Sequence, residues 1–253
     1  MPGVVGDRAK GISSRASRLG NNRGSAELQR TFRLPDDRLA RVRFTTAADG
    51  DLRVDRPAAE LAPIRERLVD RPWTWLRQAH ETSVVPVRWA GDHAGATADA
   101  AVTHAGVDDA VLAIHTADCA PVALVSPEGV LGAVHAGWRG LEGGVVESTV
   151  ALMRAHGAST ISAVLGPCIH VECYEFGPVE LDRLSARYGD QVRGVTSEGS
   201  LALNPPIAVA TALGRAGVGD LDTVQMCTAC DTGFFSHRAR SDTGRQAMLV
   251  WLE

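Results

Sequence analysis

Three side chains that can bind a metal ion follow or end predicted strands. Cys119 lies in the segment HTADCAPV, after a buried strand predicted at residues 111–116. His135 ends another predicted strand, residues 131–135, and His80 lies at the end of an earlier strand or turn. A catalytic zinc ion takes three protein ligands of these types and leaves a fourth position open for water. Together the three residues predict a catalytic zinc site.

The spacing of these residues is not by itself a zinc signature. The ligands are separated by 39 and 16 positions, so buried core residues of the same types remain an alternative explanation. The turn-forming residues 126–129 (SPEG) favour a hairpin between strands at 122–125 and 131–135. That hairpin would bring His135 beside Cys119.

Four motifs in the same order resemble one known family. They are TADCAPV at 116–122, HAGWRG at 135–140, GPCI at 166–169 with CYE at 173–175, and FFS at 234–236 followed by Arg238 and TGR at 243–245. The pattern spans about residues 40 to 253 and resembles the YfiH-like laccase-domain family, whose members are also called multicopper polyphenol oxidoreductases.

This resemblance implies a fold, a metal and an activity. The implied fold is a mixed-sheet α/β/β/α layered sandwich, and the implied catalytic zinc lies on His80, Cys119 and His135. The implied activities are purine nucleoside phosphorylase, adenosine deaminase and methylthioadenosine phosphorylase, with purine nucleosides and phosphate as substrates. The chain departs from the family at Glu81, where a glycine is usual, and at residues 47–54, where the family's Ser-Leu-Asn-Leu-Gly segment is not recognisable. A substrate contact from residues 47–54 is therefore not implied.

Three further functions remain open on the same residues. A true laccase needs several copper ions held largely by paired histidines, whereas this chain has eight histidines and no His-x-His. Copper outcompetes zinc at most nitrogen and sulfur sites, so adventitious copper would explain a weak oxidase activity. The same zinc chemistry would also suit an amidase that edits a peptidoglycan precursor. A non-enzymatic metal-binding partner protein would hold the ion without turnover.

Phosphate binding is predicted at arginines, because Lys10 is the only lysine. Guanidinium groups bind phosphate oxygens in pairs. Arg139 precedes a helix predicted from Gly143, whose N-terminus would favour an anion, and Arg238 lies with Arg240 and Arg245 in a second basic group. We predict Arg139 and Arg238 as substrate-binding residues, with surface ion pairs as the alternative for each.

The remaining cysteines and Asp118 have less specific patterns. Cys227 and Cys230, with Cys168 and Cys173, have the ligand types of a four-thiolate zinc site, but the second pair is loosely spaced and we expect buried thiols instead. Asp118 has three candidate roles: it orients a ligand, it protonates a purine nitrogen, or it simply caps a turn. The other histidines are predicted to be surface or core residues: His93, His104, His115, His156, His170 and His237.

The strand and helix patterns in the sequence predict an α/β (α+β) protein with helices outside a mixed sheet. Further strands are expected at 39–46, 161–165, 221–226 and 247–252, and helices at 61–68, 143–155, 178–188 and from Pro205, capped by Asn204, to Gly217.

Composition predicts one domain, residues 31–253, after a basic tail. Residues 1–30 hold six basic and two acidic side chains among Gly, Ser and Asn, which predicts disorder rather than nucleic-acid binding. No stretch has the about 18 apolar residues of a membrane span, and no secretory signal is recognisable. We therefore expect a cytoplasmic protein with no membrane partner, and the oligomeric state is open.

Overall fold

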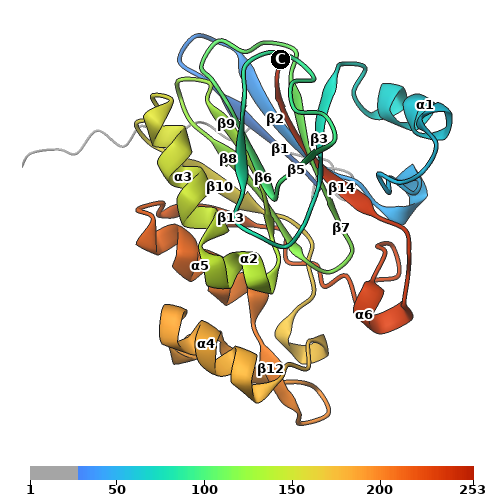
Figure 1. Ribbon diagram of the computed structural model, residues 1–253, viewed down its shortest axis with the longest axis vertical. Coiled ribbons are helices and arrows are strands. Elements are labelled where there is room, and N and C mark those ends of the chain that lie inside the picture. Colours follow the sequence, from blue (N-terminus) through green and yellow to red (C-terminus); the bar gives the residue numbers. More distant parts are fainter. Residues whose placement is uncertain (1–27) are drawn as a thin grey trace, which may run out of the picture.

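Two mixed six-stranded sheets packed face to face form the centre of the computed structural model, which describes residues 28–253 (Figure 1). The first sheet has the order β1 (Gln29–Arg33), β2 (Leu39–Phe44), β14 (Gln246–Leu252), β7 (Val111–Thr116), β3 (Trp73–Arg77), β5 (Ala96–Thr97). The second has the order β13 (Asp220–Thr223), β10 (Ser162–Leu165), β8 (Ala120–Val125), β9 (Leu131–Ala136), β6 (Ala100–Thr103), β4 (Val84–Val87). A separate pair joins β11 (Arg193–Val195) and β12 (Leu201–Leu203).

Alternate residues of the central strands build different cores. In β7, Leu112 and Ile114 pack between the two sheets, whereas Val111 and Ala113 pack on the outer side of the first sheet. The strand is buried on both faces, which explains its continuous apolar sequence.

Helices cover the outer faces of both sheets. Helix α1 (Ala58–Leu68) covers the first sheet, and α3 (Val145–Ala155) and α5 (Pro205–Arg215) cover the second, so they lie on opposite sides in Figure 1. The α2 (Trp138–Gly143) and α4 (Pro178–Tyr188) helices join the second group, and α6 (His237–Arg240) lies before β14. These layers confirm the expected α/β/β/α sandwich.

The structure corrects the helix predicted at residues 143–155. Gly144 adopts a left-handed conformation with φ of 94° and separates α2 from α3. Helix α2 therefore begins at Trp138 and has only 6 residues, too few for a strong N-terminal anion site. The predicted N-cap of α5 is confirmed, because the Asn204 side chain accepts a hydrogen bond from Ile207 N at 3.2 Å.

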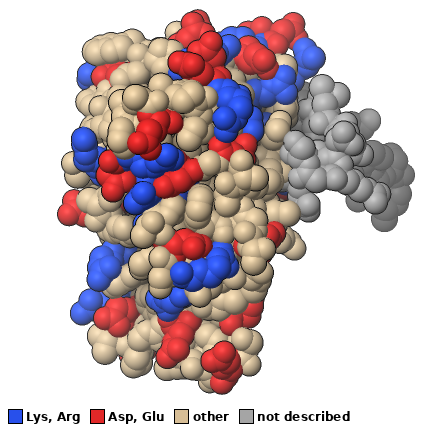
Figure 2. Space-filling model, turned by 90° about the vertical axis from the view of Figure 1, so that its right-hand side faces the viewer, with Lys and Arg blue, Asp and Glu red and all other residues tan. Residues whose placement is uncertain are grey.

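The predicted basic tail lies mostly outside the described residues, which begin at 28. Its last residues, Gln29 and Arg30, pair with β2 as part of β1, so the folded part starts earlier than the predicted boundary at 31. Between residues 28 and 253 there is no helix with the length and apolar character of a membrane span. On the face in Figure 2, acidic and basic side chains are interspersed.

Candidate metal centre and its cavities

The three predicted metal ligands come together from both sheets. Cys119 lies where the chain leaves β7 in the first sheet and enters β8 in the second. In the β8–β9 hairpin, Pro121 lies opposite His135, so His135 comes beside Cys119 as predicted. His80 follows β3 in the first sheet.

Their donor atoms surround one point. One ligand atom from each of His80, Cys119 and His135 lies within 4.8 Å of the other two, and Cys119 Sγ is 3.9 Å from His80 Nε2. The two imidazole rings meet edge to face, with centroids 4.8 Å apart. His135 is buried, Cys119 is half-buried and His80 is exposed, so one side of the centre is open. The donor types and the open side fit a catalytic zinc ion.

Gly137 allows the three ligands to approach. A Cβ atom at this position would lie 2.9 Å from His80 Cδ2, 3.4 Å from His135 Cε1 and 3.5 Å from Cys119 Sγ. The first of these separations is a clash with a ring atom. The glycine of the HAGWRG motif is therefore explained by its contact with the metal centre.

Asp99 is a residue of the centre that no sequence motif indicated. It is fully buried, and its Oδ1 is 2.7 Å from His135 Nδ1. A carboxylate on the far nitrogen of a ligand histidine sets the tautomer and orientation of the ring. A single acid in the apolar run 98–102 (ADAAV) was the available signal.

The same carboxylate shapes the His80 loop. Asp99 accepts hydrogen bonds from the backbone N–H groups of Ala79 (3.2 Å), His80 (2.9 Å) and Glu81 (2.8 Å). These bonds hold His80 in the left-handed region, with φ of 60°, which is unfavourable for a residue with a side chain. Glu81 does not have a positive φ, so the backbone at this position does not require the glycine usual in the family.

Cys119 and His135 stabilise each other's charged forms. Burial alone would raise the pKa of the Cys119 thiol, but the charges and hydrogen bonds of His135 and His80 lower it to about 6. Burial alone would lower the pKa of His135, but the Cys119 thiolate and Asp99 raise it to about 9. Thiolate is the form of cysteine that binds metals, so the surroundings prepare Cys119 as a ligand.

The centre lies in the wall of a cavity of about 350 Å³. A cavity of this size is within the range of small-molecule sites. Its lining includes Arg53 and Val54, so residues 47–54, for which the resemblance implied no substrate contact, do border the cavity. His115 also lines it; both ring nitrogens are buried, without a hydrogen-bond partner among the described residues.

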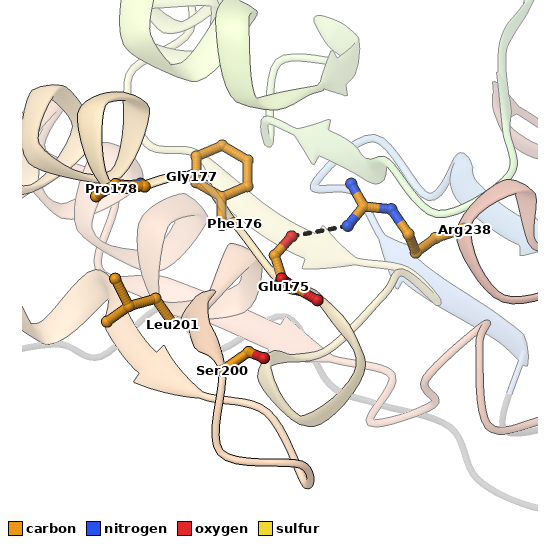
Figure 3. Close-up of a pocket in the computed structure, with 7 residues that line it drawn as sticks. All are labelled: Glu175, Phe176, Gly177, Pro178, Ser200, Leu201 and Arg238. Atoms are coloured by element: carbon orange, nitrogen blue, oxygen red, sulfur yellow. Dashed lines mark hydrogen bonds between the residues drawn. The ribbon is translucent and has the colours of Figure 1, made fainter.

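The two arginines predicted for phosphate lie outside this lining. Arg238 lines a neighbouring cavity of about 490 Å³, where its guanidinium points toward Glu175 and donates to the Glu175 carbonyl at 2.7 Å (Figure 3). Arg139 stacks over Trp138, 4.1 Å from the ring centroid. The arginines that line the cavity of the metal centre are Arg53 and Arg245.

Asp118 lies at the start of α6 and caps the chain there. Its carboxylate accepts hydrogen bonds from the Thr228 hydroxyl, the Ser236 hydroxyl and the Arg238 backbone N–H, each at 2.7 Å. These bonds tie the turn that carries Cys119 to the start of α6. Of the three roles considered for Asp118, the geometry favours the cap.

The expectation of buried thiols is only half right. Cys168 and Cys227 are buried, but Cys173 is half-buried and Cys230 is exposed. Both lie outside the sheets, Cys173 at the end of a short 3-10 helix (Val171–Cys173) and Cys230 in a turn.

The layered fold and the three-ligand centre define an α/β/β/α protein with a candidate metal site at the junction of its sheets. The chain belongs to the family described as multi-copper polyphenol oxidoreductase laccase, whose sequence profile matches residues 45–253. The resemblance predicted from the motifs is thereby confirmed.

Curated relatives carry a different description. The chain is 38% identical over 188 residues to "Purine nucleoside phosphorylase ORF3" of Streptomyces griseus, covering 71% of this chain and 74% of that protein. It is 35% identical over 219 residues to "Purine nucleoside phosphorylase Rv2149c" of Mycobacterium tuberculosis, covering 83% and 86%.

Solved structures have the same fold. A Bacillus licheniformis hypothetical protein, YfiH, superposes with a TM-score of 0.76 at 25% identity, covering 91% of this chain and 98% of that one. NMB0706 of Neisseria meningitidis superposes with a TM-score of 0.72 at 26% identity, covering 89% and 99%.

Proposed function

We propose that this chain is a zinc-dependent purine nucleoside phosphorylase that also deaminates adenosine and cleaves methylthioadenosine. The observation that carries the proposal is the convergence of His80, Cys119 and His135 in the wall of a cavity of about 350 Å³. Relatives that are 31–38% identical and named purine nucleoside phosphorylase support nucleosides and phosphate as the substrates.

Zinc on these residues would supply a Lewis acid and lower the pKa of a bound water, which suits hydrolytic deamination. Asp99 accepts the hydrogen bond of His135 Nδ1, leaving Nε2 of this ring for the metal. The open side at His80 leaves room for a substrate.

His115 supports binding of a polar base in the cavity. Burial, then the charges of Arg65 and Arg245, lower its pKa to about 3, so the imidazole is neutral at pH 7. A neutral imidazole has one donor and one acceptor nitrogen, and both lack partners among the described residues. Because buried polar atoms are normally paired, we propose that the imidazole turns toward the cavity when substrate binds and that the purine pairs with one of its nitrogens.

Phosphorolysis requires phosphate at C1′ of the ribose, where it forms the new C–O bond as the bond to the purine breaks and the purine takes up a proton. We propose that Arg238 and Arg139 hold this phosphate by charge and position it. Arg238 donates one guanidinium N–H to the Glu175 carbonyl. Its remaining guanidinium N–H groups could donate to phosphate oxygens. The alternative phosphate-binding residues are Arg53 and Arg245, which line the cavity of the metal centre.

A laccase, an amidase and a binding protein have less support. Among residues 28–253 one group of metal ligands contains histidine, whereas a multicopper oxidase needs several copper sites. An amidase that cleaves a peptidoglycan precursor would use the same zinc centre, and a metal-binding partner protein would use it without turnover. For the compartment we propose the cytoplasm, because all five cysteines are free thiols.

Product chromatography tests the proposal. Adenosine should give inosine without phosphate, and free purine base plus ribose 1-phosphate only when phosphate is present. Arg238→Ala should lower phosphorolysis about tenfold or more while leaving deamination nearly unchanged, because only phosphorolysis needs the anion. Arg183→Ala, at an exposed position on α4, is the matched control.

Nucleosides left intact with and without phosphate would refute the purine assignment. Oxygen consumption with phenols in proportion to bound copper would identify a laccase, cleavage of a muramoyl amide would identify the amidase, and saturable binding without product would identify a binding protein.

A further inference from the structure

A second group of metal-binding side chains lies outside the candidate metal centre. Glu172, Cys173, Cys227 and Cys230 each offer one donor atom, and these four atoms lie within 4.8 Å of one another. Cys230 Sγ is 3.2 Å from Cys173 Sγ and 3.9 Å from Glu172 Oε1. Around one tetrahedral zinc ion with Zn–S bonds of about 2.3 Å, two sulfur ligands lie about 3.8 Å apart. The four donors are therefore close to the separations that one ion requires.

Burial raises the pKa of the Cys227 thiol, and backbone N–H groups around the sulfur act in the opposite direction. Cys227 Sγ accepts an N–H hydrogen bond from His170 at 3.3 Å, and further N–H bonds come from Cys230 and Ala229 in the turn that follows. Hydrogen bonds to the charged form of a group stabilise it. Cys227 and Cys230 also have the Cys-x2-Cys spacing typical of structural zinc sites.

We propose that Glu172, Cys173, Cys227 and Cys230 bind a second zinc ion. Four protein ligands leave no open position, so the site is structural rather than catalytic. It differs from the four-thiolate arrangement considered from the sequence, because Glu172 takes the place of Cys168, which is not among the converging donors. Cys230 is exposed and Cys173 is half-buried, so an ion can reach the site from solvent.

The ion would join two loops that form one wall of the cavity in Figure 3. The first loop continues from Cys173 to Glu175 and Phe176, and the second continues from Cys230 to Arg238. The protein already connects these loops, through the bond from Arg238 to the Glu175 carbonyl and the stacking of Arg238 on Tyr174 at 4.8 Å. Zinc at their base would fix the wall without touching the reacting atoms.

Cobalt substitution tests this site, because thiolate-to-cobalt charge transfer reports the number of sulfur ligands. The full chain is stripped with a chelator, kept reduced and loaded with Co²⁺. We expect two ions in the unmodified protein and one in Cys119→Ala, with the strong charge-transfer band of a three-thiolate site retained. Cys230→Ser should lose one ion and most of that band, whereas the matched control Cys168→Ala should keep both ions.

Three results would overturn the proposal. Two of them are a Cys119→Ala protein that binds no cobalt and a Cys230→Ser protein with the cobalt content and spectrum of the unmodified chain. A Cys173–Cys230 disulfide in protein purified under reducing conditions would also overturn it, since a disulfide removes two ligands. If Cys230→Ser does not fold, Glu172→Gln replaces it and should weaken cobalt binding at this site about tenfold or more, as measured by chelator competition.

The same experiment separates this site from the proposed function. One ion that Cys230→Ser removes and Cys119→Ala does not would support the second site and contradict the zinc centre of the phosphorylase. One ion with the opposite behaviour would contradict the second site alone.

Discussion

At the scale of single residues, the candidate metal centre depends on the groups behind its ligands. Asp99 is fully buried and contacts two of the three ligand residues, His80 through the backbone and His135 through the ring. Gly137 leaves room for all three, since a Cβ atom at this position would lie 2.9 to 3.5 Å from their side chains. The ligands are therefore held in place by neighbours that do not bind the metal themselves.

Replacing Asp99 should weaken zinc binding. Asp99→Asn removes the charge that orients His135 and one acceptor for the loop at His80, so zinc affinity should fall about 10- to 100-fold in a chelator competition assay. Asp92→Asn, at a buried acid that accepts a hydrogen bond from Arg88 N, is the matched control and should retain affinity. Equal affinities in the two variants would show that Asp99 does not orient the ligand.

His115 should make the protein less stable as the pH falls. Its pKa is about 3 in the folded protein, mainly because of burial, and about 6.5 when unfolded. Below pH 6.5 the unfolded chain therefore binds a proton that the folded chain does not, so the stability present above this pH is lost down to about pH 3. From pH 7 to 5 this loss should be about 2 kcal/mol.

Urea unfolding at pH 7 and pH 5 measures this contribution. The free energy of unfolding should fall less in His115→Gln than in the unmodified protein, by about the same 2 kcal/mol, because the amide does not titrate. An identical pH dependence in both proteins would mean that His115 is not buried in its neutral form.

At the scale of elements, the short connections decide where the chemistry lies. The β8–β9 hairpin places His135 opposite Pro121, and the turn before β8 carries Cys119 from one sheet to the other. Gly137 follows β9 directly and is the N-cap of α2, so the strand and the helix both meet at the metal centre.

Two glycine variants separate this contact from general helix effects. Gly137→Ala should lower zinc affinity about tenfold or more, because the added Cβ would lie 2.9 Å from His80 Cδ2. Gly214→Ala, in α5, meets no atom within 4 Å and should keep zinc affinity while raising stability by about 0.5–1 kcal/mol. Zinc titration and thermal unfolding of both variants provide the comparison, and an unchanged affinity in Gly137→Ala would contradict the geometry.

At the scale of the whole molecule, the sandwich brings together residues that the sequence keeps apart. Local signals predicted the hairpin that places His135, since its turn residues and strand lengths are contiguous in the chain. Asp99 and Arg53 were missed because their roles depend on packing between distant segments, which no local pattern records. The break at Gly144 was missed for a related reason: an isolated glycine in a helical pattern does not reveal whether it adopts a left-handed conformation. The motif resemblance supplied the layer order that strand and helix patterns alone left open.

Zinc-dependent phosphorolysis can be measured with the metal-free protein. The metal-free protein is given inosine and phosphate, with and without zinc, and ribose 1-phosphate is measured for the unmodified chain, Cys119→Ala and His104→Ala, a histidine outside the centre that stacks on His156. We predict that zinc restores product formation in the unmodified chain and in His104→Ala. Cys119→Ala should stay about a thousandfold slower, the rate equivalent of several kcal/mol of transition-state stabilisation. Equal rates with and without zinc, or a folded Cys119→Ala protein as active as the unmodified chain, would show that phosphorolysis does not depend on zinc at this centre.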